Sequence, residues 1–136
     1  MLGQSPRAIE PRTSVPEYDV LIVEDDDLIR EELATLLRSQ SRTVAVARDG
    51  REALECLQRT RVGVVLLDLM LPVMSGWELA AAMRQDPNLA CVPILTITAV
   101  AYAHRAPPGP VFLKPLNVES LLRGTARALG EPPPRA

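Results

Sequence analysis

The sequence of 136 residues lacks the features that would place a protein in or across a membrane. It contains no run of 18 or more apolar residues, so we expect no membrane-spanning helix. Its first residues, MLGQSPRAIEPRT, hold no apolar stretch of the kind that a secretion signal carries, so we expect no signal peptide. Together these absences predict a cytoplasmic location.

Cysteine, histidine and net charge are also scarce. The only two cysteines, Cys56 and Cys91, are far apart and lack the spacing of metal ligands, so we interpret them as reduced thiols. We interpret the single histidine, His104, as a surface residue. The net charge is only −2, which gives no electrostatic reason to expect direct binding to nucleic acid.

The chain is long enough for one domain, and 47% of its residues are apolar, which is enough for a core. Prolines gather at both ends. We interpret residues 1–17 as a flexible N-terminal arm and residues 131–136 as a proline-rich tail. The domain itself should then span residues 18–130.

Between these ends, strand-like and helix-like patterns alternate. We expect strands at 18–24, 43–47, 62–68, 92–99 and 110–114, and helices at 27–39, 50–59, 75–85 and 117–129. Ser75 is a fair N-cap with Glu78 at capping-box spacing, and the last helix should face inward with Val118, Leu121, Leu122 and Leu129. The run VGVVLLD at 62–68 is apolar at nearly every position, which is typical of a parallel strand buried on both faces. The order of elements predicts an α/β fold with a doubly wound parallel sheet.

Polar residues stand where four of these strands end. Strand one ends in Glu24 and Asp25, strand three in Asp68, strand four in Thr98 and strand five in Lys114. In a parallel sheet the carboxyl ends of the strands meet at one edge, where open α/β sheets place their ligands. We therefore expect these side chains to converge in one pocket.

The chemistry of that set favours a metal and a phosphoryl group. Neighbouring carboxylates repel one another and raise each other's pKa values. A hard divalent cation removes this conflict, and oxygen ligands with room for water favour Mg²⁺. Asp68 could then act as a nucleophile and form an aspartyl phosphate, while Thr98 and Lys114 would contact the phosphoryl oxygens.

Each of these residues has an ordinary structural explanation when it is taken alone. An aspartate after a strand usually caps a turn, and acidic residues before a helix complement its dipole.

Two other kinds of functional site fit the sequence less well. A phosphatase of the haloacid dehalogenase kind needs an acid two residues after the nucleophile, where this chain has Met70. A dinucleotide-binding fold needs a glycine-rich turn after strand one, where this chain has Glu-Asp-Asp-Asp.

Four motifs together resemble the receiver domain of bacterial two-component response regulators. They are LIVEDD (21–26), LLDLMLPVMSGWE (66–78), PILTITA (93–99) and FLKP (112–115). The resemblance covers about residues 18–130 and implies a flavodoxin-like sheet with strand order 2-1-3-4-5. It also implies that Asp68 accepts a phosphoryl group from a sensor histidine kinase or a histidine phosphotransfer protein.

The same resemblance assigns roles to the other residues. Glu24 and Asp25 match the acidic pair, and Asp25, Asp68 and the backbone carbonyl of Met70 would bind Mg²⁺. Thr98 matches the switching hydroxyl and Lys114 the lysine beside the phosphoryl group, with a cis bond to the following proline. Such a domain is not an enzyme beyond catalysing its own phosphorylation and a slow autodephosphorylation.

The sequence departs from the receiver pattern in three places. Only residues 99–110 lie between Thr98 and the last strand, and three prolines there disfavour a helix. We therefore expect the fourth helix to be a stub at 99–105 or missing. Val111 stands at the aromatic switch position. Apolar Met70 and Val100 follow Asp68 and Thr98 by two residues, which predicts a long-lived phosphorylated form.

These departures lie on the face that receivers commonly use for signalling. They favour a single-domain regulator that signals by docking to an unidentified downstream protein or by relaying phosphate, without binding nucleic acid or a membrane. The shortened crossover keeps one alternative open, a receiver-like interaction module that is not phosphorylated.

Overall fold

Strands and helices alternate along the chain in the computed structural model, which describes residues 15–131. The strands are β1 (Tyr18–Val23), β2 (Val44–Ala47), β3 (Val62–Asp68), β4 (Ile94–Thr98) and β5 (Val111–Leu113). The α-helices are α1 (Asp27–Ser39), α2 (Gly50–Arg59), α3 (Gly76–Gln85) and α4 (Val118–Ala128). Each lies within two residues at either end of the range expected from the sequence.

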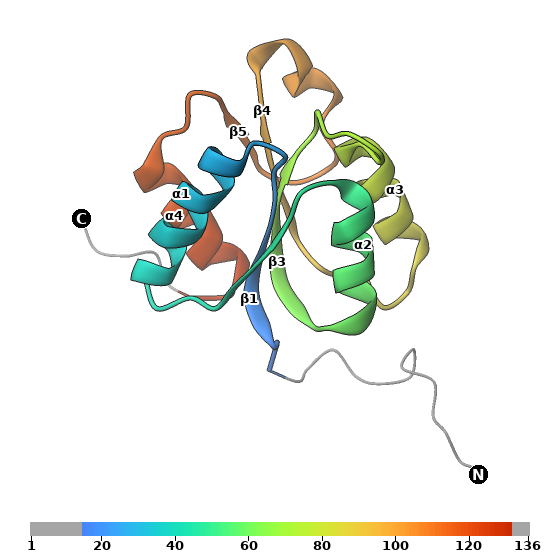
Figure 1. The fold of residues 1–136 in the computed structure, drawn as a ribbon, viewed down its shortest axis with the longest axis horizontal. Helices are drawn as coiled ribbons and strands as arrows, with labels where there is room; N and C mark the ends of the chain where they lie inside the picture. Colours follow the sequence, from blue (N-terminus) through green and yellow to red (C-terminus); the bar gives the residue numbers. More distant parts are fainter. Residues whose placement is uncertain (1–14, 132–136) are drawn as a thin grey trace.

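The five strands form one parallel sheet with the order β2-β1-β3-β4-β5, which confirms the predicted fold class and strand order. Helices α1 and α4 cover one face of the sheet, and α2 and α3 cover the other (Figure 1). All strands therefore end at the same edge, and the loops that follow them meet there.

The central strands are buried because helices cover both of their faces. Side chains that alternate along β1 and β3 belong to two separate apolar clusters, one on each face of the sheet. Leu21 and Val65 pack toward α2 and α3, whereas Ile22 and Leu66 pack toward α1 and α4. This two-sided burial explains why the run at 62–68 shows no polar alternation.

Each α-helix begins at a side chain that caps its first turn. Asp26, Asp49, Ser75 and Asn117 accept hydrogen bonds from backbone amides three residues later. Ser75 and Glu78 form a complete capping box, as their spacing predicts. The caps fix where the chain turns from each loop into its helix, including the loop that follows Asp68.

The crossover between β4 and β5 contains no α-helix. Its place is taken by a 3₁₀ helix, η2 (Val100–Arg105), so the shortened fourth helix is confirmed. Trp77 at the start of α3 holds this segment. Its indole Nε1 donates a 2.9 Å hydrogen bond to the Arg105 carbonyl, and its ring lies 6.0 Å from that of Tyr102.

The packing of the last helix differs from the expected inner face at one position. Leu121 is fully buried, whereas Val118, expected to face inward, is 48% exposed. Val118 is the first residue of α4, and periodicity alone does not show what that first turn of the helix packs against.

The ends of the chain lie mostly outside the described residues. This holds for residues 1–14 of the expected N-terminal arm and for residues 132–136 of the expected tail. Glu17 is among the described residues, and its backbone amide donates a 2.9 Å hydrogen bond to the Arg61 carbonyl.

Across residues 15–131 none of the helices is both long and apolar enough to span a membrane.

Candidate functional site

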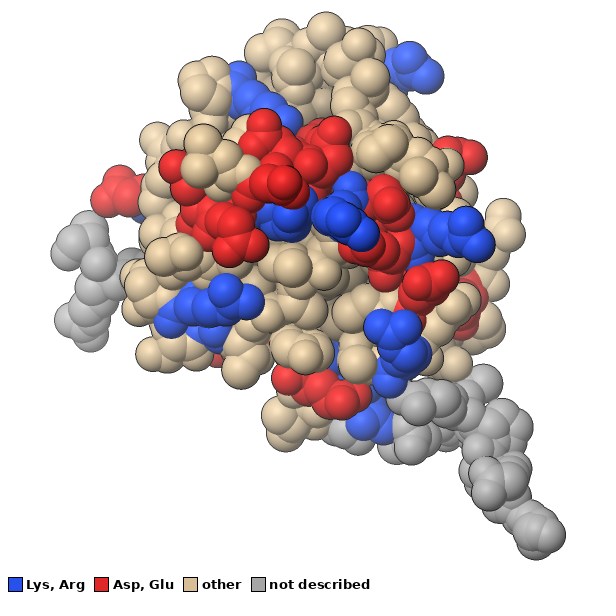
Figure 2. Space-filling view, viewed as in Figure 1, with Lys and Arg blue, Asp and Glu red and all other residues tan. Residues whose placement is uncertain are grey.

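The acidic residues expected to converge do so at the carboxyl edge of the sheet. Val23 and Leu67 are register partners, so Glu24 and Asp68 follow on neighbouring strands. Carboxylate oxygens of Glu24, Asp25 and Asp68 all lie within 4.8 Å of one another. Glu24 and Asp68 are only 3% and 4% exposed, whereas Asp25 faces solvent. Figure 2 shows acidic side chains gathered near this edge with basic side chains beside them.

Lys114 is the cation that the fold brings to these carboxylates. Its Nζ lies 3.3 Å from Asp68 Oδ2 and 3.9 Å from Glu24 Oε1. The backbone amide of Lys114 donates a 2.9 Å hydrogen bond to the Thr98 carbonyl, which anchors the residue where β5 ends. The ammonium group thus reaches across β4 to the end of β3. The bond from Lys114 to Pro115 is cis.

The surroundings of Glu24 disfavour the ionised form of its carboxyl group. Burial raises the pKa of this carboxyl from 4.5 to about 7, and the negative charge of Asp68 adds to the rise. A 3.0 Å hydrogen bond from the Asp26 amide and the charge of Lys114 act in the opposite direction. One ammonium group therefore does not fully compensate the carboxylates gathered here.

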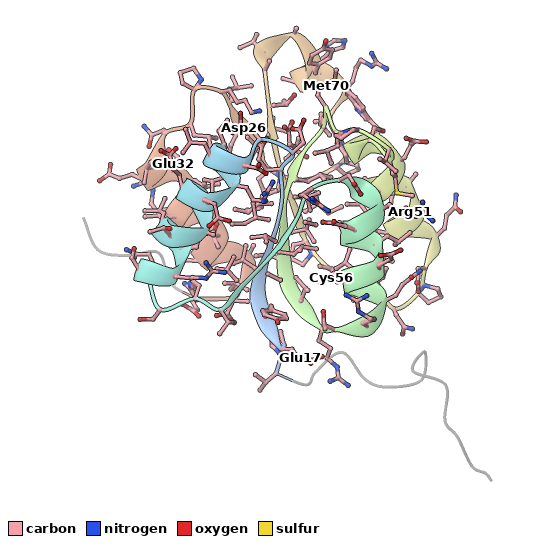
Figure 3. The ribbon with its side chains drawn as sticks, viewed as in Figure 1. Glu17, Asp26, Glu32, Arg51, Cys56 and Met70 are labelled. Carbon is pink, nitrogen blue, oxygen red and sulfur yellow. The ribbon has the colours of Figure 1, made fainter. Side chains whose placement is uncertain are left out.

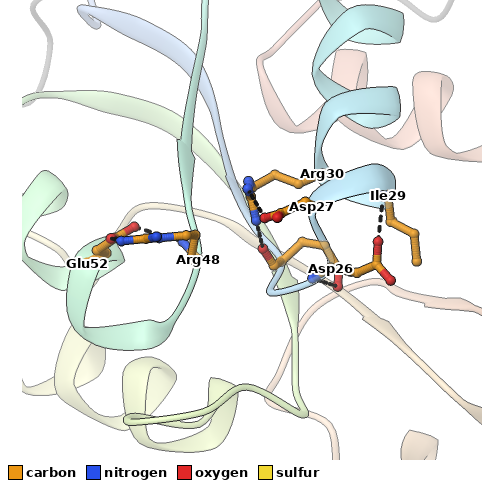
Figure 4. Close-up of polar contacts among 7 residues, drawn as sticks. Asp26, Asp27, Ile29, Arg30, Arg48 and Glu52 are labelled. Atoms are coloured by element: carbon orange, nitrogen blue, oxygen red, sulfur yellow. Dashed lines mark hydrogen bonds and ion pairs between the residues drawn. The ribbon is translucent and has the colours of Figure 1, made fainter.

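The first turn of α1 contacts the backbone of Glu24 through a hydrogen bond. Asp26 caps the helix, and Arg30 donates a 3.0 Å hydrogen bond from Nη1 to the Glu24 carbonyl oxygen. Arg30 is 8% exposed and also pairs with Asp27, as Figure 4 shows beside the separate Arg48–Glu52 pair. Sequence patterns did not indicate Arg30, because an arginine at a helix position gives no sign that it points into the core.

Thr98 stands at the end of β4 with its hydroxyl buried. It is 1% exposed, and its Oγ1 has no hydrogen-bond partner among residues 15–131. A buried hydroxyl without a partner is costly, so this atom is available to hydrogen-bond a group that binds beside it. Thr98, Asp68 and Lys114 are thus brought together as the sequence indicates.

Met70 lies in the loop after β3, at the mouth of the site. Its backbone amide donates a 3.2 Å hydrogen bond to Asp68 Oδ1, and its side chain is 53% exposed. Figure 3 shows Met70 and Asp26 at the same end of the molecule. The role expected for its backbone carbonyl as a metal ligand stays a prediction.

Gly76 allows the loop after Asp68 to fold tightly. A Cβ atom at this position would lie 2.5 Å from the Asp68 carbonyl oxygen and 2.7 Å from Leu69 Cα. The Gly76 amide also donates a 2.9 Å hydrogen bond to the Leu69 carbonyl. The glycine therefore lets α3 begin directly against the strand end that carries Asp68.

The donor set fits a small, hard divalent cation. Three carboxylates meet, two of them buried, and burial penalises the charge of Glu24. A cation bound between these oxygens would offset their repulsion, and oxygen ligands are those that Mg²⁺ prefers. These residues thus form an acidic cluster suited to a metal, beside an ammonium and a free hydroxyl.

Comparison with known proteins identifies the class to which this fold and site belong. The response regulator receiver domain family matches residues 20–107, so the chain belongs to that family. It shares 28% identity and a TM-score of 0.77 with the receiver domain of sensor histidine kinase PA1611 from Pseudomonas aeruginosa, covering 84% of this chain and 98% of that one. That structure has a magnesium ion coordinated in its active-site cleft.

Two further relatives of this chain are response regulators. The chemotaxis response regulator CheY4 of Vibrio cholerae is 32% identical with a TM-score of 0.75, covering 82% of this chain and 98% of that one. The DNA-binding response regulator MtrA of Mycobacterium tuberculosis is 40% identical over 80 residues, which are 59% of this chain and 34% of that protein. The chain thus spans about a third of the length of the curated relatives that it matches.

Proposed function

We propose that this receiver domain accepts a phosphoryl group on Asp68 from a phosphohistidine of a sensor histidine kinase or a histidine phosphotransfer protein. The observation that carries the proposal is the meeting of Lys114 Nζ, 3.3 Å from Asp68 Oδ2, with three carboxylates whose oxygens lie within 4.8 Å. This arrangement holds a nucleophile, a metal-binding set and a compensating cation in one place.

In the transfer, a carboxylate oxygen of Asp68 attacks phosphorus and forms an O–P bond. The N–P bond of the phosphohistidine breaks, and the imidazole leaves with the electron pair and takes up a proton. Lys114 and the Thr98 hydroxyl are placed to bind phosphoryl oxygens as charge develops on them. Mg²⁺ held by Asp25, Asp68 and the Met70 carbonyl, with Glu24 beside them, would supply charge neutralisation in this step.

The chain would catalyse only its own phosphorylation and a slow loss of the phosphoryl group, and in this sense it is not an enzyme. Its signal would pass by docking to a downstream protein or by phosphorelay. The relatives named as DNA-binding regulators match this chain over 34% of their length. We propose that residues 18–130 do not themselves bind DNA.

The second candidate is a receiver-like interaction module that is not phosphorylated. One observation favours it: β4 and β5 are joined by η2 instead of an α-helix, and Val111 replaces an aromatic switch residue. The complete site argues for the first candidate, because a domain released from phosphorylation has no need of buried Glu24 and Asp68.

Intact-mass analysis with Mg²⁺ and acetyl phosphate separates the two candidates. A gain of one phosphoryl group in the native protein, and none in Asp68→Asn, is the result we expect. A folded protein that binds Mg²⁺ but gains no phosphoryl group, either from acetyl phosphate or from a phosphorylated histidine phosphotransfer protein, would favour the interaction module.

A further inference from the structure

We propose that Arg30 is a positioning residue for the metal-binding carboxylates and that it makes the site selective for Mg²⁺ over Ca²⁺. The proposal rests on the metal site of the proposed function. The side chain of Arg30 binds the backbone carbonyl oxygen of Glu24 and the carboxylate of Asp27, and neither group belongs to the three carboxylates that meet. Arg30 therefore acts through the backbone that carries Glu24 and Asp25.

Arg30 occupies a core position of α1. The buried residues of this helix are Arg30, Leu33, Ala34 and Leu37, the spacing of a helix face that packs against a core. The three apolar residues belong to the cluster between α1, α4 and the sheet. An aliphatic side chain at position 30 would continue this face without the cost of burying a charge. A guanidinium that is only 8% exposed therefore indicates that its hydrogen-bond donors are needed there.

Asp27 orients the guanidinium group of Arg30. The Asp27 side chain is 85% exposed, so charge attraction in this pair is screened by solvent and contributes little to stability. Its effect is geometric, because the donors of a guanidinium have fixed directions. With one nitrogen bound to Asp27, the other nitrogen, Nη1, donates a 3.0 Å hydrogen bond to the Glu24 carbonyl. Figure 4 shows Arg30 beside Asp27 at the start of α1.

Hydrogen bonds hold Glu24 from both sides of its backbone. Its amide donates a 3.1 Å hydrogen bond to the Ala47 carbonyl at the end of β2, and its carbonyl accepts the bond from Arg30. A peptide group is planar, so a fixed carbonyl also fixes the direction of the next Cα atom, which is that of Asp25. Asp25 is exposed, and so its place in the site depends on this backbone more than on packing.

Mg²⁺ and Ca²⁺ differ in how precisely their ligands must be placed. Mg²⁺ requires near-ideal octahedral geometry with short bonds, whereas Ca²⁺ accepts more ligands at longer and more variable distances. A carboxylate whose backbone is free to turn can still bind Ca²⁺ but binds Mg²⁺ less well. Loss of a hydrogen bond that orients a ligand lowers metal affinity by about 10–100-fold. We therefore expect Arg30 to contribute more to the affinity for Mg²⁺ than to that for Ca²⁺.

Charge and geometry predict opposite results when Arg30 is replaced by methionine. Removal of a positive charge near carboxylates strengthens their attraction for a cation, whereas loss of the hydrogen bond to the Glu24 carbonyl weakens binding. Methionine is unbranched and adapts to the space of the arginine side chain. The matched control is Arg38→Met, which makes the same charge change on the same helix. Arg38 also donates a hydrogen bond to a backbone carbonyl, over 3.3 Å to Val44 where β2 begins.

Titration of Mg²⁺ and Ca²⁺ into the metal-free full chain tests the proposal, with binding followed by the amide chemical shifts of Asp25 and Met70. Arg30→Met should weaken Mg²⁺ binding by about tenfold and Ca²⁺ binding by less than about threefold. Arg38→Met should change neither affinity by more than about twofold, because its charge lies about two turns further along α1 and is screened by solvent. Amide nitrogen relaxation of the metal-free proteins should show a lower order parameter at Asp25 in Arg30→Met alone.

Arg30→Lys tests the geometry without a change of charge. Lysine carries a single ammonium group, which cannot reproduce the fork of a guanidinium between Asp27 and the Glu24 carbonyl. We expect this variant to bind Mg²⁺ about threefold more weakly than the native protein. Circular dichroism shows whether each variant is folded, and if Arg30→Met did not fold, the comparison of Arg30→Lys with the native protein would decide the proposal.

Several outcomes would overturn the proposal. Tighter or unchanged Mg²⁺ binding by Arg30→Met, or native affinity in Arg30→Lys, would show that the hydrogen bond to the Glu24 carbonyl does not set the metal affinity. Equal loss in Arg30→Met and Arg38→Met, or equal loss for both ions, would mean a general effect on the fold. In these cases the native protein still binds Mg²⁺ and the proposed function stands. If the native protein bound no Mg²⁺ at Asp25 and Asp68, the metal site of the proposed function would fail together with this role of Arg30.

Discussion

The indole Nε1 of Trp77 donates a 2.9 Å hydrogen bond to the carbonyl oxygen of Arg105. The guanidinium of the same arginine lies 5.2 Å from the centre of the Trp77 ring. These contacts tie the end of η2 to the start of α3, while the other end of η2 follows Thr98 after a single residue. The tryptophan is thus linked through η2 to Thr98, whose hydroxyl is buried at the end of β4.

We expect phosphorylation to change the fluorescence of Trp77. A phosphoryl group on Asp68 would offer the unpartnered Thr98 hydroxyl an acceptor, and movement of Thr98 would shift η2. In place of an aromatic side chain that could fill the space left by Thr98, the chain has Val111. We therefore expect the movement of Thr98 to be transmitted to η2. Emission recorded with Mg²⁺ and acetyl phosphate measures it.

The control for this prediction is Asp68→Asn under the same conditions. If its fluorescence changed as much as that of the native protein, the signal would come from the added reagents and the link through η2 would be wrong. Arg105→Ala should keep the phosphorylation and reduce the size of the fluorescence change.

The raised pKa of Glu24 makes Mg²⁺ binding depend on pH. Below pH 7 this carboxyl becomes protonated in the metal-free protein, and protons then compete with the metal. We expect the affinity for Mg²⁺ to fall about tenfold between pH 7.5 and pH 5.5. Isothermal titration calorimetry measures the change, and Glu24→Gln should largely remove it.

The free energy of unfolding of the metal-free protein should rise as the pH falls, whereas the affinity for Mg²⁺ should decrease. The folded state holds the Glu24 proton up to about pH 7, while the unfolded chain releases it near its ordinary pKa of about 4.5. Protonated Glu24 therefore adds to the free energy of unfolding below pH 4.5, and this contribution is lost as the pH rises through 7. Urea unfolding in EDTA at pH 5 and pH 8 checks the sign, and Glu24→Gln should show a smaller difference.

Removing charges from the site should have opposite effects on the metal-free fold. Asp68→Asn removes one of two buried, repelling carboxylates, so we expect the free energy of unfolding to rise by about 1 kcal/mol. Lys114→Met removes the ammonium that compensates both, and we expect a loss of about 1–2 kcal/mol, reduced because this side chain is partly exposed. Urea unfolding in EDTA measures both, and changes of the same sign would contradict this explanation.

Gly76→Ala should disturb both the fold and the site. The new methyl group would meet the Asp68 carbonyl oxygen and Leu69 Cα, and overpacking of this kind costs about 1–3 kcal/mol. Because the clash involves the backbone of Asp68 itself, we also expect slower phosphorylation by acetyl phosphate. Intact-mass time courses measure the rate.

Gly130→Ala serves as the matched control for that variant. Gly130 has φ of +78°, and a methyl group added there would have no neighbouring atom within 4 Å, so alanine strains the backbone far from the site. It should reduce stability by about 1 kcal/mol and leave the phosphorylation rate unchanged. Equal slowing in both variants would mean that the rate follows stability alone.

The phosphorylated form should be long-lived. Met70 and Val100 follow Asp68 and Thr98 by two residues and are 53% and 69% exposed, so we expect these apolar side chains to hinder the approach of water to Asp68. Met70→Asn and Val100→Arg should shorten the lifetime, measured by intact mass after the phosphodonor is removed. A lifetime that neither substitution changes would show that these side chains do not control water access.

Much of the fold could be predicted from local patterns. The apolar run at 62–68 indicated a strand buried on both faces, and Ser75 with Glu78 indicated the start of α3. Both follow from short-range chemistry, namely side-chain period and backbone capping. The prolines after Thr98 likewise showed that no full helix could form before β5.

Other features depended on contacts between distant parts of the chain. No sequence pattern indicated that Arg30 turns inward to the Glu24 carbonyl or that Val118 stays exposed. The tie between Trp77 and η2 and the close approach of Gly124 to the Phe112 ring also arise only when α3 and α4 have packed on their neighbours. Helical periodicity describes one element at a time and does not report what that element meets.

The order of strands and helices along the chain, and the residue types at each strand end, could be predicted from local sequence, because both depend on neighbouring residues. How those residues act together depends on the packed fold. It placed Lys114 Nζ 3.3 Å from Asp68 across an intervening strand, and it buried Glu24 so that its pKa rises to about 7. Distances and desolvation are set by packing among residues far apart in the chain, and for this reason the charge balance of the site exists only in the folded domain.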